Sequence, residues 1–453
     1  MLSALETEGQ GNVTTNLPVQ SLINAHPFSR YQRVIFVICF AIVLLDGFDT
    51  AAAGFLAVSL QHEWGITKQA LAPVLSAALI GLSIGSLLAG PIADKYGRKI
   101  VIGISVGFFG FTCLLSAFVD SLDQLVFLRL LTGLGLGAAL PNVVTLMSEF
   151  CPDKSRSFVT NALFCGFPLG AALGGFISAW MIPHWGWRSV LVAGGLFPIV
   201  LSIVVFALMP ESVRFMAAAG RSSKKIAYIL SKITSREVLE SDFVVAAPVP
   251  HSITAGLSLI LSRPYIIGTL MLWLSYFMGL MIFYSLINWM PILLKDTGIQ
   301  PANASLISAL FPLGGVGAIF FGWLMDRFNP NIVVATGYAL TAVLLYVIGH
   351  VSDSGIYLML FVFAGGIMMN MSQVSLAALA AAFYPTQARV TGISWMLGIG
   401  RFGGVAGSFL IADLMRRNFD FVGILSSLSL AGLIAAIALI VKQVSSRSTN
   451  KPG

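Results

Sequence analysis

Charged residues are scarce in this chain. They make up 10% of its 453 residues, whereas soluble domains carry about 25%. Hydrophobic residues account for 57%, and the mean hydropathy is +0.89. This composition excludes a soluble globular enzyme carried on a single membrane anchor, and it indicates a polytopic membrane protein.

The sequence also lacks the short motifs of several enzyme classes. It has no His-Glu-x-x-His zinc motif, no Gly-x-x-x-x-Gly-Lys-Ser/Thr phosphate loop and no Cys-x-x-Cys pair. Its four cysteines follow no metal-ligand spacing and are expected to be small apolar core residues. We therefore expect no enzyme activity, no metal and no cofactor. Without a nucleotide site, a proton gradient is the natural energy source, with protons as the coupling ion.

About twelve apolar runs come near the ~20 residues that a helix needs to cross a bilayer. They are expected to be helices, because lipid offers the backbone no other hydrogen-bond partner. Our approximate spans are 34–58, 70–92, 100–119, 124–149, 157–181, 188–208, 265–290, 302–324, 331–351, 355–382, 390–415 and 420–441. The predicted fold is an all-α polytopic membrane protein. Its expected parts are an N-terminal segment 1–33, a six-helix bundle 34–208, a linker 209–264, a second six-helix bundle 265–441 and a tail 442–453.

The basic residues predict the orientation in the membrane. With both termini in the cytoplasm, 19 of the 26 Lys and Arg residues fall in cytoplasmic segments and 5 in outer loops. Cytoplasmic loops are enriched in Lys and Arg, so this orientation is favoured. The net charge of +7 is therefore attributed to topology, and no nucleic-acid partner is expected.

The two halves of the chain repeat each other. The segment Gly90–Lys95 is echoed by Gly322–Arg327, and Cys151–Arg156 is echoed by Tyr384–Arg389. Each pair follows corresponding spans in the two halves. Parallel repeats around a central site are typical of rocking-bundle transporters.

Two aspartates lie inside the first span. Asp46 and Asp49 are three residues apart, so they share one face of a helix. A charged Asp at mid-membrane costs about 2.5–3.5 kcal/mol on insertion scales, and a neighbouring carboxylate further favours protonation. We interpret the pair as proton acceptors, without assigning the proton to either one. The alternative is a buried carboxylate held by hydrogen bonds from neighbouring helices, or one that lies near the outer water.

Two arginines also lie inside spans. Arg129 is expected to pair with Asp49 or Asp46, either as a switched pair or as a permanent structural one. Arg401 in span eleven has no acid at its depth. We predict that Arg401 binds a substrate carboxylate, the alternative being capping by backbone carbonyls or a distant acid.

Several other polar and aromatic residues are candidates for the substrate site. Asn370 and Gln373 share a face of span ten, where they would either join helices or contact a ring hydroxyl. Four aromatic residues could stack on an aromatic ring or simply pack in the bundle: Trp273, Tyr276, Tyr284 and Trp395.

The motifs together resemble the major facilitator superfamily. The resemblance rests on Gly90-x-x-x-Asp94-Lys95-x-Gly97-Arg98-Lys99, on Arg129-x-x-x-Gly133-x-Gly135-x-Gly137 and on Pro210-Glu211-Ser212-x-Arg214. Narrower features resemble the aromatic acid:proton symporter family, nearest its 4-hydroxybenzoate and protocatechuate carriers. These are Asp46-Gly47-Phe48-Asp49, Ala138-Ala139-Leu140-Pro141-Asn142, Asn288-Trp289-Met290-Pro291, Tyr384-Pro385-x-x-x-Arg389-x-x-Gly392 and Gly400-Arg401.

The resemblance implies proton-coupled import of an aromatic carboxylate across the bacterial inner membrane by alternating access, for aromatic catabolism, by a monomer. The resemblance implicates both Asp46 and Asp49 in proton coupling. Glu149 would have a gating or proton-coupling role or form an ion pair with Arg156 or Arg98. The expected latches between the halves are Gly90, Asp94, Gly97, Arg98, Asp326, Arg327 and Arg389, and Asp94 could cap a helix N-terminus. The alternatives are a sugar, polyol or other organic-anion symporter, or a membrane sensor that does not transport.

Overall fold

A computed structural model of the protein describes residues 17–218, 223–234, 236–239, 243–244, 253–317, 324–325, 327–351, 355–385 and 388–449. Within these residues the chain is almost entirely helical, as expected. The exceptions are two short strands, β1 (Leu17–Pro18) and β2 (Phe243–Val244), which pair in parallel outside the long helices.

The first half of the chain forms a bundle whose helices begin and end at sequence signals. Ser29 caps the first long helix through a capping box with Gln32, and Gly65 ends that helix in the left-handed conformation. Ser121 caps another N-terminus. The helices are α2 (Arg30–Trp64), α3 (Leu71–Tyr96), α4 (Arg98–Leu115), α5 (Leu122–Glu149), α6 (Asp153–Phe164), α7 (Gly166–Trp185) and α8 (Trp187–Leu208). The predicted fifth span is thus divided between α6 and α7.

The second half forms a matching bundle. Pro301 and Pro330 occupy the first positions of two of its helices, where the missing N–H costs nothing. The helices are α12 (Ile266–Asp296), α13 (Pro301–Leu313), α15 (Pro330–His350), α16 (Gly355–Phe383), α17 (Arg389–Arg416) and α18 (Phe421–Thr449). The predicted eighth span appears as α13 and a short 3₁₀ turn, Gly314–Gly317, and 318–323 lie outside the described residues.

Short helices precede the first bundle and connect the two. They are α1 (Val19–Asn24) before α2, and α9 (Val213–Ala218), α10 (Ser223–Thr234) and α11 (Ile253–Ile260) in the linker. α1 is fixed to the first bundle by Asn24, whose amide donates to Asp153 at 2.7 Å and whose oxygen accepts from the Asp153 N–H at 2.8 Å. The N-terminal segment and the linker therefore meet at one end of the bundles.

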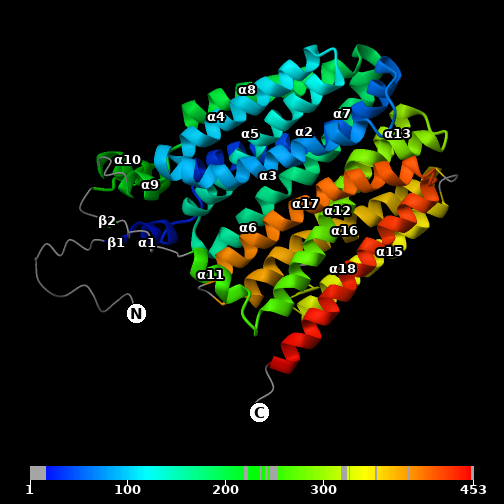
Figure 1. The fold of residues 1–453 in the computed structure, drawn as a ribbon. Helices are drawn as coiled ribbons and strands as arrows, with labels where there is room; N and C mark the ends of the chain where they lie inside the picture. Colours follow the sequence, from blue (N-terminus) through cyan, green and yellow to red (C-terminus); the bar gives the residue numbers. More distant parts are fainter. Residues whose placement is uncertain are drawn as a thin grey trace, which may run out of the picture.

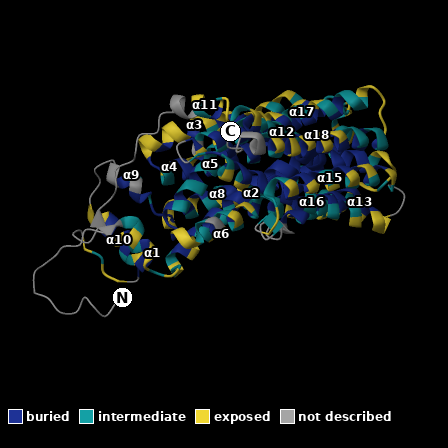
Figure 2. Ribbon diagram, turned by 90° about the horizontal axis from the view of Figure 1, so that it is seen from below, coloured by how far each residue is buried: buried dark blue, intermediate teal, exposed yellow. Residues whose placement is uncertain are grey.

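Eleven helical segments of the described residues are long and apolar enough to cross a membrane. Their outward faces carry large apolar side chains, such as Leu87 and Ile203, with exposed fractions of 76% and 65%. Figure 2 shows the buried residues inside the bundles and the exposed ones on outer faces and helix ends. Such a broad apolar exterior suits contact with lipid.

The two bundles lie side by side, and the first helix of the first bundle begins at the same end at which the last helix of the second bundle finishes (Figure 1). We call this the terminal end; α2 begins there and α18 finishes there. At the opposite end α7 lies against α13 and α2 against α12. An ion pair between Lys68 and Asp296, 2.5 Å apart, joins the bundles at that end.

Glycines allow the closest helix contacts. A Cβ on Gly137 of α5 would overlap the backbone of Leu82 in α3, and one on Gly81 would overlap the Leu130 carbonyl oxygen. The backbones of α3 and α5 therefore touch, as small residues permit in membrane proteins. This contact fixes the depth and rotation of α5, which carries Arg129.

Candidate functional site

Asp46 and Asp49 lie one turn apart in α2, and both are buried, with exposed fractions of 3% and 1%. Their neighbours differ. Asp46 accepts a long hydrogen bond of 3.4 Å from the Thr50 hydroxyl. Asp49 accepts from two side chains of other helices. The two carboxylates, alike in the sequence, therefore occupy different environments.

Asp49 forms a buried ion pair with Arg129. Both its oxygens accept from Nη1 of Arg129, at 2.9 and 3.0 Å, and both side chains are 1% exposed. The Cys113 thiol donates to the same carboxylate at 3.2 Å. The structure thus selects Asp49 from the two acids that the sequence allowed for Arg129. A pair so fully enclosed joins α2, α4 and α5 in the core of the first bundle.

Arg401 extends from α17 toward the first bundle. Its Nη1 donates to the hydroxyl of Ser86 in α3, and its side chain is only partly buried. The guanidinium is near enough to Asp46 for the two charges to attract each other. One cation of the second bundle therefore contacts the first bundle through Ser86 and lies within electrostatic range of one of its acids, Asp46.

Tyr276 and Tyr284 of α12 lie within electrostatic range of the same arginine. Both phenols interact with Arg401, and Tyr284 also interacts with Asp46. The Tyr276 ring lies against Gly400, where any Cβ would collide with it. The absence of a side chain at position 400 therefore brings the phenol beside the guanidinium.

Gln373 of α16 contacts two other helices of the second bundle, α15 and α12. Its Oε1 accepts from the Tyr338 hydroxyl at 2.7 Å, and the amide occupies the notch left by Gly279. Its Nε2 is buried and has no hydrogen-bond partner among the described residues. The Tyr276 side chain interacts with this amide, which connects Gln373 with the surroundings of Arg401.

Asn370 has a different role from Gln373, although both lie on α16. Its Nδ2 donates to the Gly366 carbonyl at 2.7 Å and to the Phe311 carbonyl of α13 at 3.4 Å. The Gly366 bond lies within α16, and the Phe311 bond joins α16 to α13, which is one of the two roles that the sequence allowed for this amide. The two amides of α16 therefore have different hydrogen-bond partners, as the two aspartates of α2 do.

Trp273 and Trp395 form a stacked pair nearer the terminal end. Their ring centroids are 6.0 Å apart with an interplanar angle of 20°. Trp395 is 41% exposed, while Nε1 of Trp273 is buried without a partner among the described residues. The pair joins α12 to α17 and offers an aromatic surface one to two turns from Tyr276 and Arg401.

Glu149 is the centre of a polar cluster at the terminal end of the first bundle. It forms an ion pair with Arg98, one of the two predicted partners, and accepts from the Ser212 hydroxyl at 2.5 Å. Glu211 accepts from the N–H groups of Arg98 and Lys99 at 2.9 and 3.1 Å. Glu211, not Asp94, therefore caps the N-terminus of α4.

Most of the other predicted latch residues that the structure describes are exposed. Asp94 is an exposed residue in the last turn of α3, and Gly90 has no atom within 4 Å of where a Cβ would stand. Arg327 and Arg389 are exposed at the same end. Gly97 is buried, with φ +99° and its Cα against Glu211. Asp326 lies outside the described residues.

Sequence reasoning missed several participants: Ser86, Cys113, Glu211, Ser212 and Tyr338. Ser212 and Glu211 belong to the Pro210-Glu211-Ser212 motif, so a signal for them existed. Serine, cysteine and tyrosine in apolar runs carry no such signal, because each is common as a packing residue. Among the described residues no group of His, Cys, Asp or Glu could hold a metal ion.

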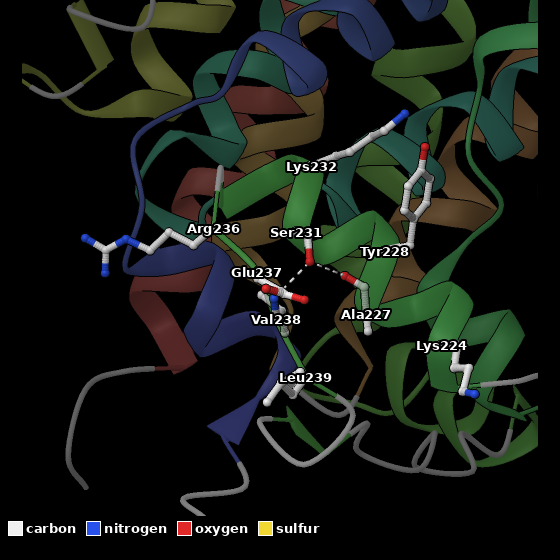
Figure 3. A pocket seen from close by; sticks show the side chains of 9 residues that line it. All are labelled: Lys224, Ala227, Tyr228, Ser231, Lys232, Arg236, Glu237, Val238 and Leu239. Carbon is white, nitrogen blue, oxygen red and sulfur yellow. Dashed lines mark hydrogen bonds between the residues drawn. The ribbon is translucent and has the colours of Figure 1, made fainter.

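A pocket of about 580 Å³ lies on the linker, away from this site. It is formed where the segment after α10 folds back, since the Val238 N–H donates to the Ser231 hydroxyl at 2.9 Å. Figure 3 shows the side chains of Lys224, Lys232 and Arg236 pointing in different directions. They do not converge on one anion, so we place the functional site at Arg401 and Asp46 instead.

Comparison with known proteins agrees with the fold. A sequence profile of the Major Facilitator Superfamily matches residues 38–408 and 272–453. The inward open conformation of the xylose transporter XylE from E. coli superposes with a TM-score of 0.71 and 16% identity, covering 90% of this chain and 96% of that one. The expected all-α fold with two repeated bundles is confirmed.

Two bacterial relatives are similar over nearly the whole chain. The 4-hydroxybenzoate transporter PcaK of Acinetobacter baylyi is 45% identical, with 95% of each chain covered. The gallate transporter of Pseudomonas putida is 44% identical over 94% of this chain and 95% of its own. Because such relatives are transporters, the expectation that the chain is not an enzyme is confirmed. The chain is a multi-pass membrane protein and belongs to the major facilitator superfamily.

Proposed function

We propose that this protein imports an aromatic carboxylate together with protons across the bacterial inner membrane. The observation that carries the proposal is the contact of Arg401 from the second bundle with Ser86 of the first, which brings the guanidinium within electrostatic range of Asp46. A substrate carboxylate and the Asp46 carboxylate would compete for the same guanidinium. The names of the relatives, 4-hydroxybenzoate and gallate transporters, support an aromatic acid as the cargo.

Proton coupling follows from this competition. When Asp46 is ionised it attracts Arg401 and repels an incoming anion. When Asp46 binds a proton, Arg401 becomes available for a bidentate bond to the substrate carboxylate. Proton binding and anion binding therefore favour each other, and the coupling is reciprocal. We assign the mobile proton to Asp46, because Asp49 is held by Arg129 and Cys113.

Alternating access would use the contact between the bundles. In the present conformation they are joined at the opposite end by Lys68 and Asp296, while Asp94 and Arg389 are exposed at the terminal end. The excess of basic residues in terminal-end loops favours a cytoplasmic terminal end. This conformation would then face inward, and the latches would close in the outward-facing one. A single chain contains every group used, so we expect a monomer to be functional.

The test is uptake into proteoliposomes. Wild-type protein should accumulate labelled 4-hydroxybenzoate when the outside is more acidic, and accumulation should fail without the pH gradient. Arg401→Lys should bind the acid at least about tenfold more weakly, since a lysine loses the bidentate geometry. Ser426→Ala, on α18, removes a hydroxyl far from Arg401 and serves as the control for reconstitution.

Three results would contradict the proposal. Uptake of xylose instead of aromatic acids would favour a sugar symporter. Binding without uptake would favour a sensor. Unchanged affinity in Arg401→Lys would remove Arg401 from the substrate site.

A further inference from the structure

The buried amide nitrogen of Gln373, Nε2, has no hydrogen-bond partner within standard geometry among the described residues. The exposed fraction of Gln373 is 9%, so water gives it little compensation. An unpaired buried polar group costs roughly 1–3 kcal/mol. In a transporter such a cost is understandable if the cargo supplies the missing partner.

The surroundings of Gln373 fix how the amide points. Tyr338 donates to Oε1 at 2.7 Å, and Gly279 leaves just enough room for the amide beside α12. With one end tied, the other end is presented toward its remaining polar neighbour, Tyr276. The Tyr276 ring lies against Gly400, next to Arg401 in the chain, and the phenol is within electrostatic range of the guanidinium.

We propose that Gln373 recognises a hydroxyl group on the substrate ring, so that the site selects hydroxylated aromatic carboxylates over unsubstituted ones. The proposal rests on the proposed function, in which Arg401 holds the carboxylate. A ring with a carboxylate at one end and a hydroxyl at the other would lie along Tyr276 and satisfy both groups. A phenolic hydroxyl can accept from an amide nitrogen or donate to an amide oxygen, so the match holds whichever end of the amide is free.

The other amide of α16 does not offer this contact. Nδ2 of Asn370 is used by the carbonyl groups of Gly366 and Phe311, and its Oδ1 lies close to Gly315. Trp273 also has an unpaired Nε1, but its ring is stacked on Trp395 nearer the terminal end. Of the two amides of α16, Gln373 is therefore the one that we assign to a hydroxylated ring.

The test compares three ligands that differ at one ring position: 4-hydroxybenzoate, 4-methylbenzoate and benzoate. The methyl group fills nearly the same space as the hydroxyl but forms no hydrogen bond. Equilibrium binding to the purified full-length protein should favour 4-hydroxybenzoate over both others by about tenfold or more, the effect of one buried hydrogen bond. This arm needs no variant, so it cannot fail through misfolding.

The second arm uses Gln373→Met combined with Tyr338→Phe, which removes the amide without leaving the Tyr338 hydroxyl unpaired. The preference for 4-hydroxybenzoate should fall to about twofold or less, through loss of 4-hydroxybenzoate affinity, with benzoate affinity unchanged. Ser372→Ala is the matched control, because Ser372 bonds only to the Met368 carbonyl of its own helix. It should keep the wild-type preference.

The outcomes separate this proposal from the proposed function. A preference that survives in the double variant, or an equal loss of affinity for all three acids, overturns the role of Gln373. Equal binding of the three acids by the wild type overturns hydroxyl recognition but leaves aromatic-acid transport intact. If the wild type binds none of them, the proposed function fails as well.

Discussion

Replacing each aspartate of α2 by asparagine should have opposite effects on folding and on transport. Asp49→Asn leaves the Arg129 cation buried at 1% exposure with no anionic partner. Removing one member of a buried pair costs about 3–5 kcal/mol of unfolding free energy. Asp46→Asn loses only a 3.4 Å hydrogen bond from Thr50, worth at most about 1 kcal/mol.

The assay is thermal unfolding in detergent, followed by transport in proteoliposomes. Asp49→Asn should unfold several degrees below the wild type, because each kcal/mol moves Tm by a few degrees or less in a chain of this size. Asp46→Asn should unfold near the wild-type temperature. It should also lose accumulation driven by a pH gradient while still exchanging labelled for unlabelled acid, because its substrate site is intact but its proton site is not.

A double variant separates lost charge from lost packing. In Asp49→Asn with Arg129→Gln no unpaired charge is left, and neutral replacement of a buried pair is often tolerated. Most of the stability lost in Asp49→Asn should return. The reasoning is refuted if Asp49→Asn is as stable as the wild type, or if Asp46→Asn still concentrates substrate against a gradient.

Two further predictions follow from the packing and from the charge balance. Gly137→Ala should lower the unfolding free energy by about 1–3 kcal/mol, since the added methyl overlaps Leu82. Gly398→Ala has open space around the added methyl, so it should be neutral or stabilising by up to about 1 kcal/mol. Thermal unfolding of the two variants tests this difference. With Asp46 as the one mobile proton site, a proton and a monoanion cross together without net charge, so a potassium diffusion potential imposed with valinomycin should leave uptake unchanged. Uptake that rises with an inside-negative potential would require a second proton, which contributes about 2.3 kcal/mol per 100 mV.

The depth of a residue in the membrane could be predicted from the sequence far better than the direction in which its side chain points around the helix axis. Counting along an apolar run places Asp49 and Arg129 at similar depth, which is why their pairing was anticipated, with Asp46 as the alternative. A helix turns about 100° per residue, so the choice between Asp46 and Asp49 depends on the rotation of α2 against its neighbours. That rotation is set by contacts such as Gly47 against the Phe167 carbonyl, which no run of apolar letters reveals.

The same limit explains the polar partners that were missed. Ser86 contacts Arg401 only because α3 faces α17 across the two bundles. Tyr338 contacts Gln373 because α15 lies beside α16. Neither pairing has a fixed spacing in the sequence. The Glu149–Arg98 pair was foreseeable because the ends of consecutive spans must return to the same membrane surface.

Each bundle contains one helix that carries two like polar side chains one turn apart: two aspartates on α2 and two amides on α16. In α2 one acid, Asp49, is fully bonded to neighbouring helices and its partner one turn away, Asp46, is not. In α16 one amide, Asn370, is bonded to backbone carbonyls and its partner one turn away, Gln373, keeps a free end. The bonded member helps to fix the rotation of its helix, and that rotation sets where the other side chain points. A rigid neighbour thus lets a polar group remain unpaired in the membrane until a proton or a substrate reaches it.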